Sequence, residues 1–347
     1  MAAPFQLNDV DRRVYDRSLR DFLPDAFIDI HTHVWRSQDT APRDPSSYSR
    51  VVSWPSRVAA DQPVEDLVSS YQLMFPGKSV SALIFSLVYG GDDMDRMNQY
   101  VVEASRRSGF PSLLFAHPTW TASTLEDRIR AGGHKGIKVY LNLAASYIPE
   151  REIRIFDFLP PHQLDVLARN RWVVMLHIPR DGRLRDPVNL EQMLEIERSW
   201  PGARVIIAHV GRAYCDEDLG DAFQKLGRTR DMVFDTSANT NDHVFEAALR
   251  AVGPERVLFG SDMPITRMRM RRICEGGRYV NVVPRGLYGD VSGDSHMREA
   301  DPPQSEELTL FLYEEILAIR RAAERTGLSR ADIENVFNRN AKRVLAV

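Results

Sequence analysis

The chain has 347 residues, of which 43% are hydrophobic and 27% charged, and its formal net charge is −3. This composition excludes a disordered or collagen-like chain, and the net charge offers no electrostatic footprint for nucleic acid or an anionic membrane. The two cysteines form no CxxC pair, and no apolar run approaches the ~20 residues that span a bilayer. The N-terminus has no signal-peptide features. Together these features predict a soluble cytoplasmic protein.

Residues 1–25 are polar with mixed charge and are expected to form an N-terminal extension that lies across the protein surface. After them, eight short apolar runs rich in β-branched residues follow one another and are expected to be strands. These runs are Ala26–His33, Ala82–Val88, Ser112–His117, Gly136–Asn142, Trp172–Ile178, Arg204–Val210, Met232–Ser237 and Arg256–Asp262.

Amphipathic segments between the runs predict helices, several of them ended by Gly or Pro. They cover Val64–Met74, Met94–Arg107, Leu164–Asn170, Leu190–Trp200 and His243–Val252. Eight strand–helix units predict an α/β fold of the (β/α)8 TIM-barrel type. A doubly wound sheet is the competing fold, but it would usually carry a Gly-rich phosphate turn, which the sequence lacks.

The C-terminal part is expected to add to the barrel. A long strand-eight loop over Met263–Gln304 is followed by a helix at about Ser305–Arg325. A final helix is expected to begin at Ser329, where the sequence fits a capping box. No linker or repeat divides the chain, so residues 1–347 are expected to form one domain, with 1–25 as the extension and 26–347 as barrel and C-terminal helices.

Polar residues close several of the expected strands, at the end where (β/α)8 barrels carry their chemistry. His31 and His33 are two residues apart on the first strand, so their side chains face the same side. His177 closes the fifth strand, His209 the sixth and Asp262 the eighth. A single strand-end histidine is more often a hydrogen-bonded rim residue, and Asp262 alone fits a helix cap. Together these N and O ligands describe a catalytic metal site with an open position.

This pattern of HxH on strand one, with His, His and Asp closing strands five, six and eight, resembles the amidohydrolase superfamily. The segments Ile28–His33, Phe259–Pro264 and Asn338–Ala341 are similar to its amidohydrolase-related branch. That branch includes lactonases, other hydrolases and non-oxidative decarboxylases such as aminocarboxymuconate semialdehyde decarboxylase. The resemblance extends from about Ala26 to the C-terminus; it is specific for fold and metal but weak for the substrate.

The resemblance implies one divalent metal ion, Zn²⁺ by preference with Mn²⁺ as the alternative, held by His31, His33, His177 and Asp262. His209 and Asp262 would be the catalytic residues, with His209 acting as acid or base beside the metal. Some members of the superfamily use a carboxylated strand-four lysine to bridge two metals. Lys138, which faces inward on strand four, is instead expected to bind a substrate anion or to balance an acidic neighbour.

Arginines in the loops after strands five, six and eight favour an anionic substrate, because arginine recognises carboxylate and phosphate. Arg180 and Arg212 are the preferred substrate-binding residues, since each lies three residues past a strand-end histidine. His117 closes strand three and can reach the substrate or play a structural part; Asp235 on strand seven is left open in the same way. The loop Val34–Gln62 is long enough to be a lid.

The expected activity is hydrolysis, in which water activated by the metal attacks a lactone, ester or amide carbonyl of a small, anionic substrate. The alternative is non-oxidative, metal-dependent decarboxylation of an aromatic or unsaturated carboxylic acid. A barrel without catalysis that acts as a binding protein is the third possibility, disfavoured by the complete set of metal ligands. A small-molecule partner, no nucleic acid, no membrane and a possible homo-oligomer are expected. The remaining histidines, His134, His162, His243 and His296, are expected at the surface.

Overall fold

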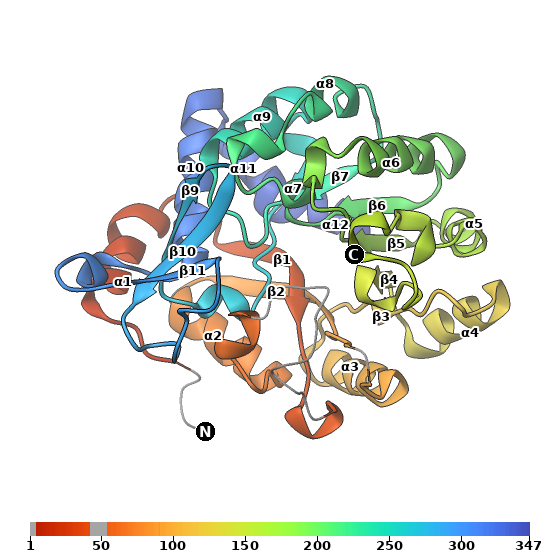
Figure 1. Ribbon diagram of the computed structural model, residues 1–347, viewed down its shortest axis with the longest axis horizontal. Helices are drawn as coiled ribbons and strands as arrows, with labels where there is room; N and C mark the ends of the chain where they lie inside the picture. Colours follow the sequence, from red (N-terminus) through yellow and green to blue (C-terminus); the bar gives the residue numbers. More distant parts are fainter. Residues whose placement is uncertain (1–4, 42–53, 90) are drawn as a thin grey trace.

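The computed structural model describes residues 5–41, 54–89 and 91–347, and its centre is a set of short parallel strands flanked by helices (Figure 1). These strands are β1 (Ala26–His33), β2 (Ser79–Phe85), β3 (Leu114–Phe115), β4 (Gly136–Val139), β5 (Val173–Leu176), β6 (Arg204–Ile207), β7 (Val233–Asp235) and β8 (Val257–Leu258). β1 pairs with β2, and β3 to β8 form a six-stranded sheet in sequence order.

Hydrogen bonds at the two seams join these sheets into a ring. On one side the backbone N–H of Ile30 donates to the carbonyl of Phe259 (3.0 Å), and Thr32 bridges Met263 in parallel. On the other side Ile84 bridges Ser112 in parallel. Eight strands joined in this order form the predicted (β/α)8 barrel, and the doubly wound alternative is wrong.

Helices connect successive strands along the outside of the ring, as right-handed parallel crossovers require. They are α2 (Val64–Met74), α3 (Met94–Ser108), α4 (Ala122–Gly132), α5 (Pro161–Asn170), α6 (Pro187–Ser199), α7 (His209–Arg212), α8 (Ala222–Leu226) and α9 (Asp242–Val252). The predicted bounds of α2 are confirmed. The sequence did not predict α4, α7 or α8.

Most strands are shorter than the apolar runs predicted, because the chain leaves the sheet just before the polar strand-end residues. β5 ends at Leu176, one residue before His177, and β6 ends at Ile207, two residues before His209. β8 spans only two residues, so Asp262 lies in the loop after it. The strand-end histidines and aspartate therefore stand on the rim of the barrel.

The N-terminal extension is more than a surface segment. It forms α1 (Asp9–Val14), begun by a capping box from Asn8, and a π-helical turn over Tyr15–Leu19. Tyr15 and Leu19 are buried, and the Tyr15 ring stacks on Tyr313 at 6.3 Å between centroids. The extension thus covers apolar side chains of the barrel's outer layer, which its polar composition did not indicate.

The long loop after β8 contains a three-stranded sheet that the sequence did not predict. Its strands are β9 (Arg271–Glu275), β10 (Arg278–Pro284) and β11 (Met297–Ala300), in the order β11-β10-β9. The chain continues into α10 (Phe311–Thr326), α11 (Arg330–Glu334) and α12 (Asn340–Leu345). Ser329 caps α11 with the predicted capping box.

A disulfide between Cys215 and Cys274 ties β9 to the loop after α7. The two cysteines are 59 residues apart in the sequence, and nothing in their spacing indicated the bridge. Disulfides persist in oxidising compartments, so the bridge does not support the expected cytoplasmic location, which stays a prediction. Among the described residues, no helix combines the length and the apolar character needed to cross a membrane.

Candidate metal centre and active site

A cavity of about 380 Å³ opens at the carboxyl ends of the barrel strands. Its polar lining consists mainly of strand-end side chains, and its apolar lining includes Trp35, Tyr140, Pro264 and Ile265. Among the polar side chains are all five sequence-predicted metal and catalytic residues together with the strand-four lysine: His31, His33, Lys138, His177, His209 and Asp262. The expected lid falls partly on residues 42–53, which lie outside the described residues.

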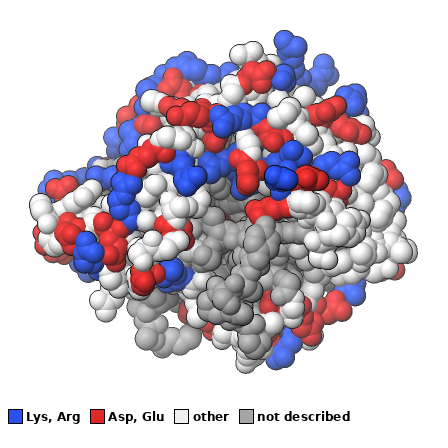
Figure 2. Space-filling model, in the orientation of Figure 1, with Lys and Arg blue, Asp and Glu red and all other residues white. Residues whose placement is uncertain are grey.

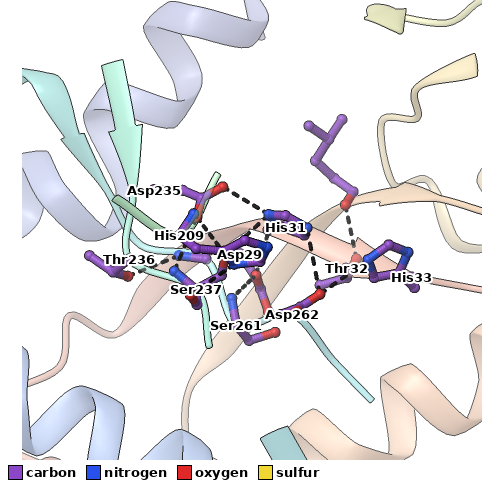
Figure 3. A network of polar contacts seen from close by, with 12 residues as sticks. Asp29, His31, Thr32, His33, His209, Asp235, Thr236, Ser237, Ser261 and Asp262 are labelled. Carbon is purple, nitrogen blue, oxygen red and sulfur yellow. Dashed lines mark hydrogen bonds and ion pairs between the residues drawn. The ribbon is translucent and has the colours of Figure 1, made fainter. Parts of the chain in front are cut away.

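His31 is held by a carboxylate behind it. Its Nδ1 lies 2.8 Å from Oδ2 of Asp235 at the end of β7, and both side chains are buried (Figure 3). A carboxylate only accepts, so Nδ1 carries the proton and Nε2 keeps its lone pair. Burial lowers the pKa of His31 to about 3. Nε2 is buried without a hydrogen-bond partner and lies 3.5 Å from Oδ1 of Asp262.

His33 presents the same kind of nitrogen to the same carboxylate. Its Nδ1 is 3.3 Å from the carbonyl oxygen of Ser86, so this nitrogen is the donor. Its Nε2 then faces Oδ1 of Asp262 at 3.1 Å. With that tautomer, two acceptors meet inside the protein, and an additional proton or a cation is needed between them. The Nε2 atoms of His31 and His33 with Oδ1 of Asp262 therefore form a donor set that fits a divalent metal.

Asp262 reaches this position from a strained backbone. Its φ is +63°, in the left-handed region that residues other than glycine rarely adopt. Its N–H donates to the carbonyl of His31 (2.8 Å), which fixes the loop against β1. Oδ1 of buried Asp29 accepts from the N–H of Ser261 (2.8 Å) and of His31 (3.2 Å). Asp29 thus clamps the two segments that carry His31 and Asp262.

His209 begins a tight turn in which four consecutive residues, 209–212, have left-handed φ values. Its Nδ1 lies 3.0 Å from the carbonyl oxygen of Ser237, and its backbone N–H donates to Oδ1 of Asp235 (2.8 Å). Nδ1 is therefore a donor and Nε2 carries the lone pair. The ring centroid is 4.9 Å from that of His31. Burial lowers the pKa of His209, so the ring is neutral near pH 7.

His177 lines the cavity but is not part of the metal-ligand set of His31, His33 and Asp262. Its ring packs edge-on against Tyr140 at 4.6 Å between centroids and is 5.3 Å from the ring of His209. Nδ1 of His177 is buried without a hydrogen-bond partner. A metal contact by His177 stays a prediction.

A second group of possible ligands, His31, His209 and Asp235, is less suited to a metal. Nδ1 of His31 is already hydrogen-bonded to Asp235, and Nδ1 of His209 to the Ser237 carbonyl. The Ser237 hydroxyl donates to Oδ1 of Asp235 (2.5 Å) and lies within 3.1 Å of both Nδ1 atoms. These groups satisfy one another, so Asp235 acts here as the orienting partner of two histidines.

Lys138 is a buried cation at the cavity, only 1% exposed. Its Nζ lies 5.1 Å from the centroid of the Phe85 ring and 5.8 Å from that of Tyr140. It forms no hydrogen bond or ion pair with any described residue. Burial lowers the pKa of Lys138 to about 8, although Asp262 and Asp235 act in the opposite direction. The ammonium is therefore mostly charged at pH 7 and available to an anion.

The other substrate-binding residues predicted from the sequence do not line the described cavity. Arg180 pairs with Asp186 (3.2 Å), which caps α6. Arg212 donates to the carbonyl oxygens of Ile178, Pro179 and Arg180, the shortest at 2.8 Å. His117 is hydrogen-bonded to Thr119 (2.7 Å). Each has an internal structural partner, so their contact with substrate stays a prediction.

Several arginines of the strand-eight loop are paired with carboxylates within the protein. Arg269 forms an ion pair with buried Asp11, and Arg285 pairs with Asp301. Figure 2 shows the same intermixing at the surface, where Lys and Arg alternate with Asp and Glu rather than forming a single basic patch on the face drawn. The expectation for His134 is wrong: it is 6% exposed and hydrogen-bonded to Ser112 (2.9 Å).

Comparison with known proteins gives the family. The amidohydrolase family model matches residues 28–272, most of the chain. The chain belongs to the amidohydrolase family. This match includes all the residues that line the centre described above, from His31 to Asp262. No curated protein matches the chain significantly.

Solved structures agree on the fold. An amidohydrolase from Burkholderia multivorans with bound HEPES has a TM-score of 0.60 at 15% identity, covering 93% of this chain and 99% of its own; another crystal form contains zinc. A probable 2-pyrone-4,6-dicarboxylic acid hydrolase from Acinetobacter baumannii has a TM-score of 0.54 at 15% identity, covering 92% and 99%. A 2,6-dihydroxybenzoate decarboxylase has a TM-score of 0.52 at 13% identity, covering 93% and 100%.

Proposed function

We propose that this amidohydrolase is a metal-dependent hydrolase of a small lactone, ester or amide that carries an anionic group. The observation that supports it most is the protonation pattern of the centre. Hydrogen bonds at Nδ1 leave the Nε2 lone pairs of His31, His33 and His209 available. Such a centre is rich in acceptors, with the Lys138 ammonium as the cation beside them.

The residues that would hold the metal are His31, His33 and Asp262, with His177 as the fourth ligand that the family resemblance implies. Their nitrogen and oxygen atoms suit Zn²⁺, and Mn²⁺ is the alternative. A divalent metal supplies Lewis-acid chemistry to such a site, because it polarises a carbonyl group and makes water more acidic. Asp235 holds His31 in the tautomer that this set needs.

The state of His209 favours hydrolysis over decarboxylation. Its Nδ1 proton is donated to the Ser237 carbonyl, and burial lowers its pKa, so Nε2 accepts a proton rather than donating one. Hydrolysis begins with removal of a proton from water, for which a neutral imidazole is the fitting base. Non-oxidative decarboxylation requires the protonation of a carbon, for which the same ring would first have to be charged.

Lys138 supplies the argument for an anionic substrate. An unpaired, buried ammonium is costly unless an anion accompanies it. The neighbouring Asp262 belongs to the metal-ligand set with His31 and His33. A substrate carboxylate or phosphate is therefore the partner that Lys138 lacks. The cavity of about 380 Å³ is of a size typical for small-molecule sites.

The test compares the wild type with His209→Gln after metal analysis of both purified proteins. We expect about one divalent metal per chain in each, and hydrolysis of carboxylate-bearing lactones or esters by the wild type. Loss of the base should lower kcat by about 10²–10⁴-fold without loss of metal. Release of CO₂ from aromatic acids without any hydrolysis would identify a decarboxylase, and a wild type without metal or turnover would identify a binding protein.

A further inference from the structure

A second cavity lies at the opposite end of the barrel, where strands β4, β5 and β6 begin. Its volume is about 590 Å³. Lys135 directly precedes β4, Trp172 directly precedes β5, and Arg204 is the first residue of β6. Arg130 and Arg171 stand at the ends of α4 and α5 and also line it. None of its described lining residues is acidic.

The cations of this cavity are unequally neutralised. Arg130 pairs with Glu126 (2.7 Å), and its guanidinium lies 5.1 Å from the Trp172 ring centroid. Arg204 donates one hydrogen bond to the carbonyl of Val344 (2.8 Å) and pairs with no described carboxylate. The side chains of Lys135 and Arg171 form no hydrogen bond or ion pair with the described residues. Burial, followed by the charge of Arg171, lowers the pKa of Arg204.

Ordinary helix electrostatics accounts for only part of this cluster. Cations near a helix C-terminus interact favourably with its dipole, which explains Arg130 and Arg171. Lys135 lies directly before β4 and Arg204 begins β6, and strands have only small net dipoles. Three cations without an acidic partner around one cavity repel one another, and an anion bound among them would relieve that repulsion.

We propose that this cavity, defined by Lys135, Arg171 and Arg204, binds a phosphate-bearing small molecule. Two guanidinium forks and one ammonium provide the donors that recognise phosphate oxygens. The cavity lies at the amino end of β4, whereas Lys138 faces the other end of the same strand. A ligand here would not compete with the substrate, so the inference does not rest on the proposed hydrolase activity.

Titration calorimetry of the full chain with pyrophosphate at 0.15 M salt tests the proposal. Lys135→Gln removes one unpaired charge, and Arg171→Gly removes another while giving glycine a position whose φ is +54°. Each should weaken binding about 10-fold, and the double variant about 100-fold, because each loses a charged hydrogen bond. Lys342→Gln removes an equal charge from an exposed site outside the cavity and should change affinity by less than about two-fold.

Lys138→Gln removes any pyrophosphate bound at the active site and should leave unchanged the binding that Lys135 and Arg171 govern. ADP in place of pyrophosphate distinguishes a free phosphate ligand, bound equally well, from a nucleotide that gains affinity by stacking near Trp172. The proposal is overturned if the wild type does not bind pyrophosphate at millimolar concentration. It is also overturned if Lys342→Gln weakens binding as much as the cavity variants do, or if Lys138→Gln alone abolishes it. Melting temperatures of all variants show that each one is folded.

Discussion

Breaking the disulfide between Cys215 and Cys274 should lower the free energy of unfolding by about 4 kcal/mol. The bridge closes a segment of 59 residues. The loss of chain entropy for a loop of that length corresponds to about 4 kcal/mol at 25 °C in the loop-closure estimate. In the folded protein the bridge attaches β9 to the loop after α7. The three-stranded sheet β9–β11, called the insertion sheet below, is thereby tethered to the barrel rim.

Urea denaturation with and without a reductant measures this contribution. Cys274 is exposed and Cys215 is fully buried, so Cys274→Ser removes the bridge with the smaller change in packing. The reduced wild type and Cys274→Ser should unfold at similar urea concentrations, both below the oxidised wild type. The chain has no other cysteine, so the reductant should not affect the variant. Equal transitions for the oxidised and reduced wild type would refute the reasoning, because the loop would then be constrained without the bridge.

Three further perturbations address the site and the barrel. Lys138→Gln should lower kcat/KM for a carboxylate substrate by about one to two orders of magnitude, since charged hydrogen bonds contribute about 1.5–3 kcal/mol. The control is the neutral methyl ester of that substrate, for which kcat/KM should not change. Asp235→Asn should weaken metal affinity by about 10–100-fold, measured by chelator competition, because an amide holds the His31 tautomer less firmly; unchanged affinity would contradict this. Burial lowers the pKa of His134 to about 4, so its stabilising contribution is present above pH 6.5 and falls by roughly 3 kcal/mol as the pH drops towards 4. His134→Gln should lack that part of the acid destabilisation in denaturation curves measured at both pH values.

The barrel could be predicted because its signals are local. Apolar runs alternate with amphipathic segments, and prolines and glycines mark where they end; Pro63 precedes α2, whose bounds agree with the prediction. The insertion sheet has no such signal. β9 reads Arg-Arg-Ile-Cys-Glu and is mostly exposed or half-buried, so apolar residues do not alternate along it. It is held by pairing with β10 and by the disulfide, both long-range contacts that a single sequence does not reveal.

Within the site, strand geometry allowed the sequence to predict which strand-end residues lie together. It did not allow prediction of the hydrogen-bond and ion-pair partners of each side chain. His31 and Asp262 meet because parallel strands bring their carboxyl ends to one rim, whatever the loops do. Whether a loop arginine faces substrate depends on which carboxylate lies within reach. Arg180 has Asp186 six residues later in the same loop, and this nearby acid is the one sequence signal that could have lowered its rank as a substrate ligand.

The sequence left Asp235 open and did not point to Asp29, because both act through hydrogen bonds to the residues that carry the site. His209 and Asp262 both have left-handed φ values, a conformation that costs about 1–2 kcal/mol per residue. Asp29 accepts from the N–H groups of His31 and Ser261, and Asp235 from the N–H of His209. These two buried carboxylates thus offset strain at the points where the chain leaves the sheet. The site residues at the rim thus combine strained backbone with hydrogen bonds to the buried carboxylates of Asp29 and Asp235, which offset the cost of that strain.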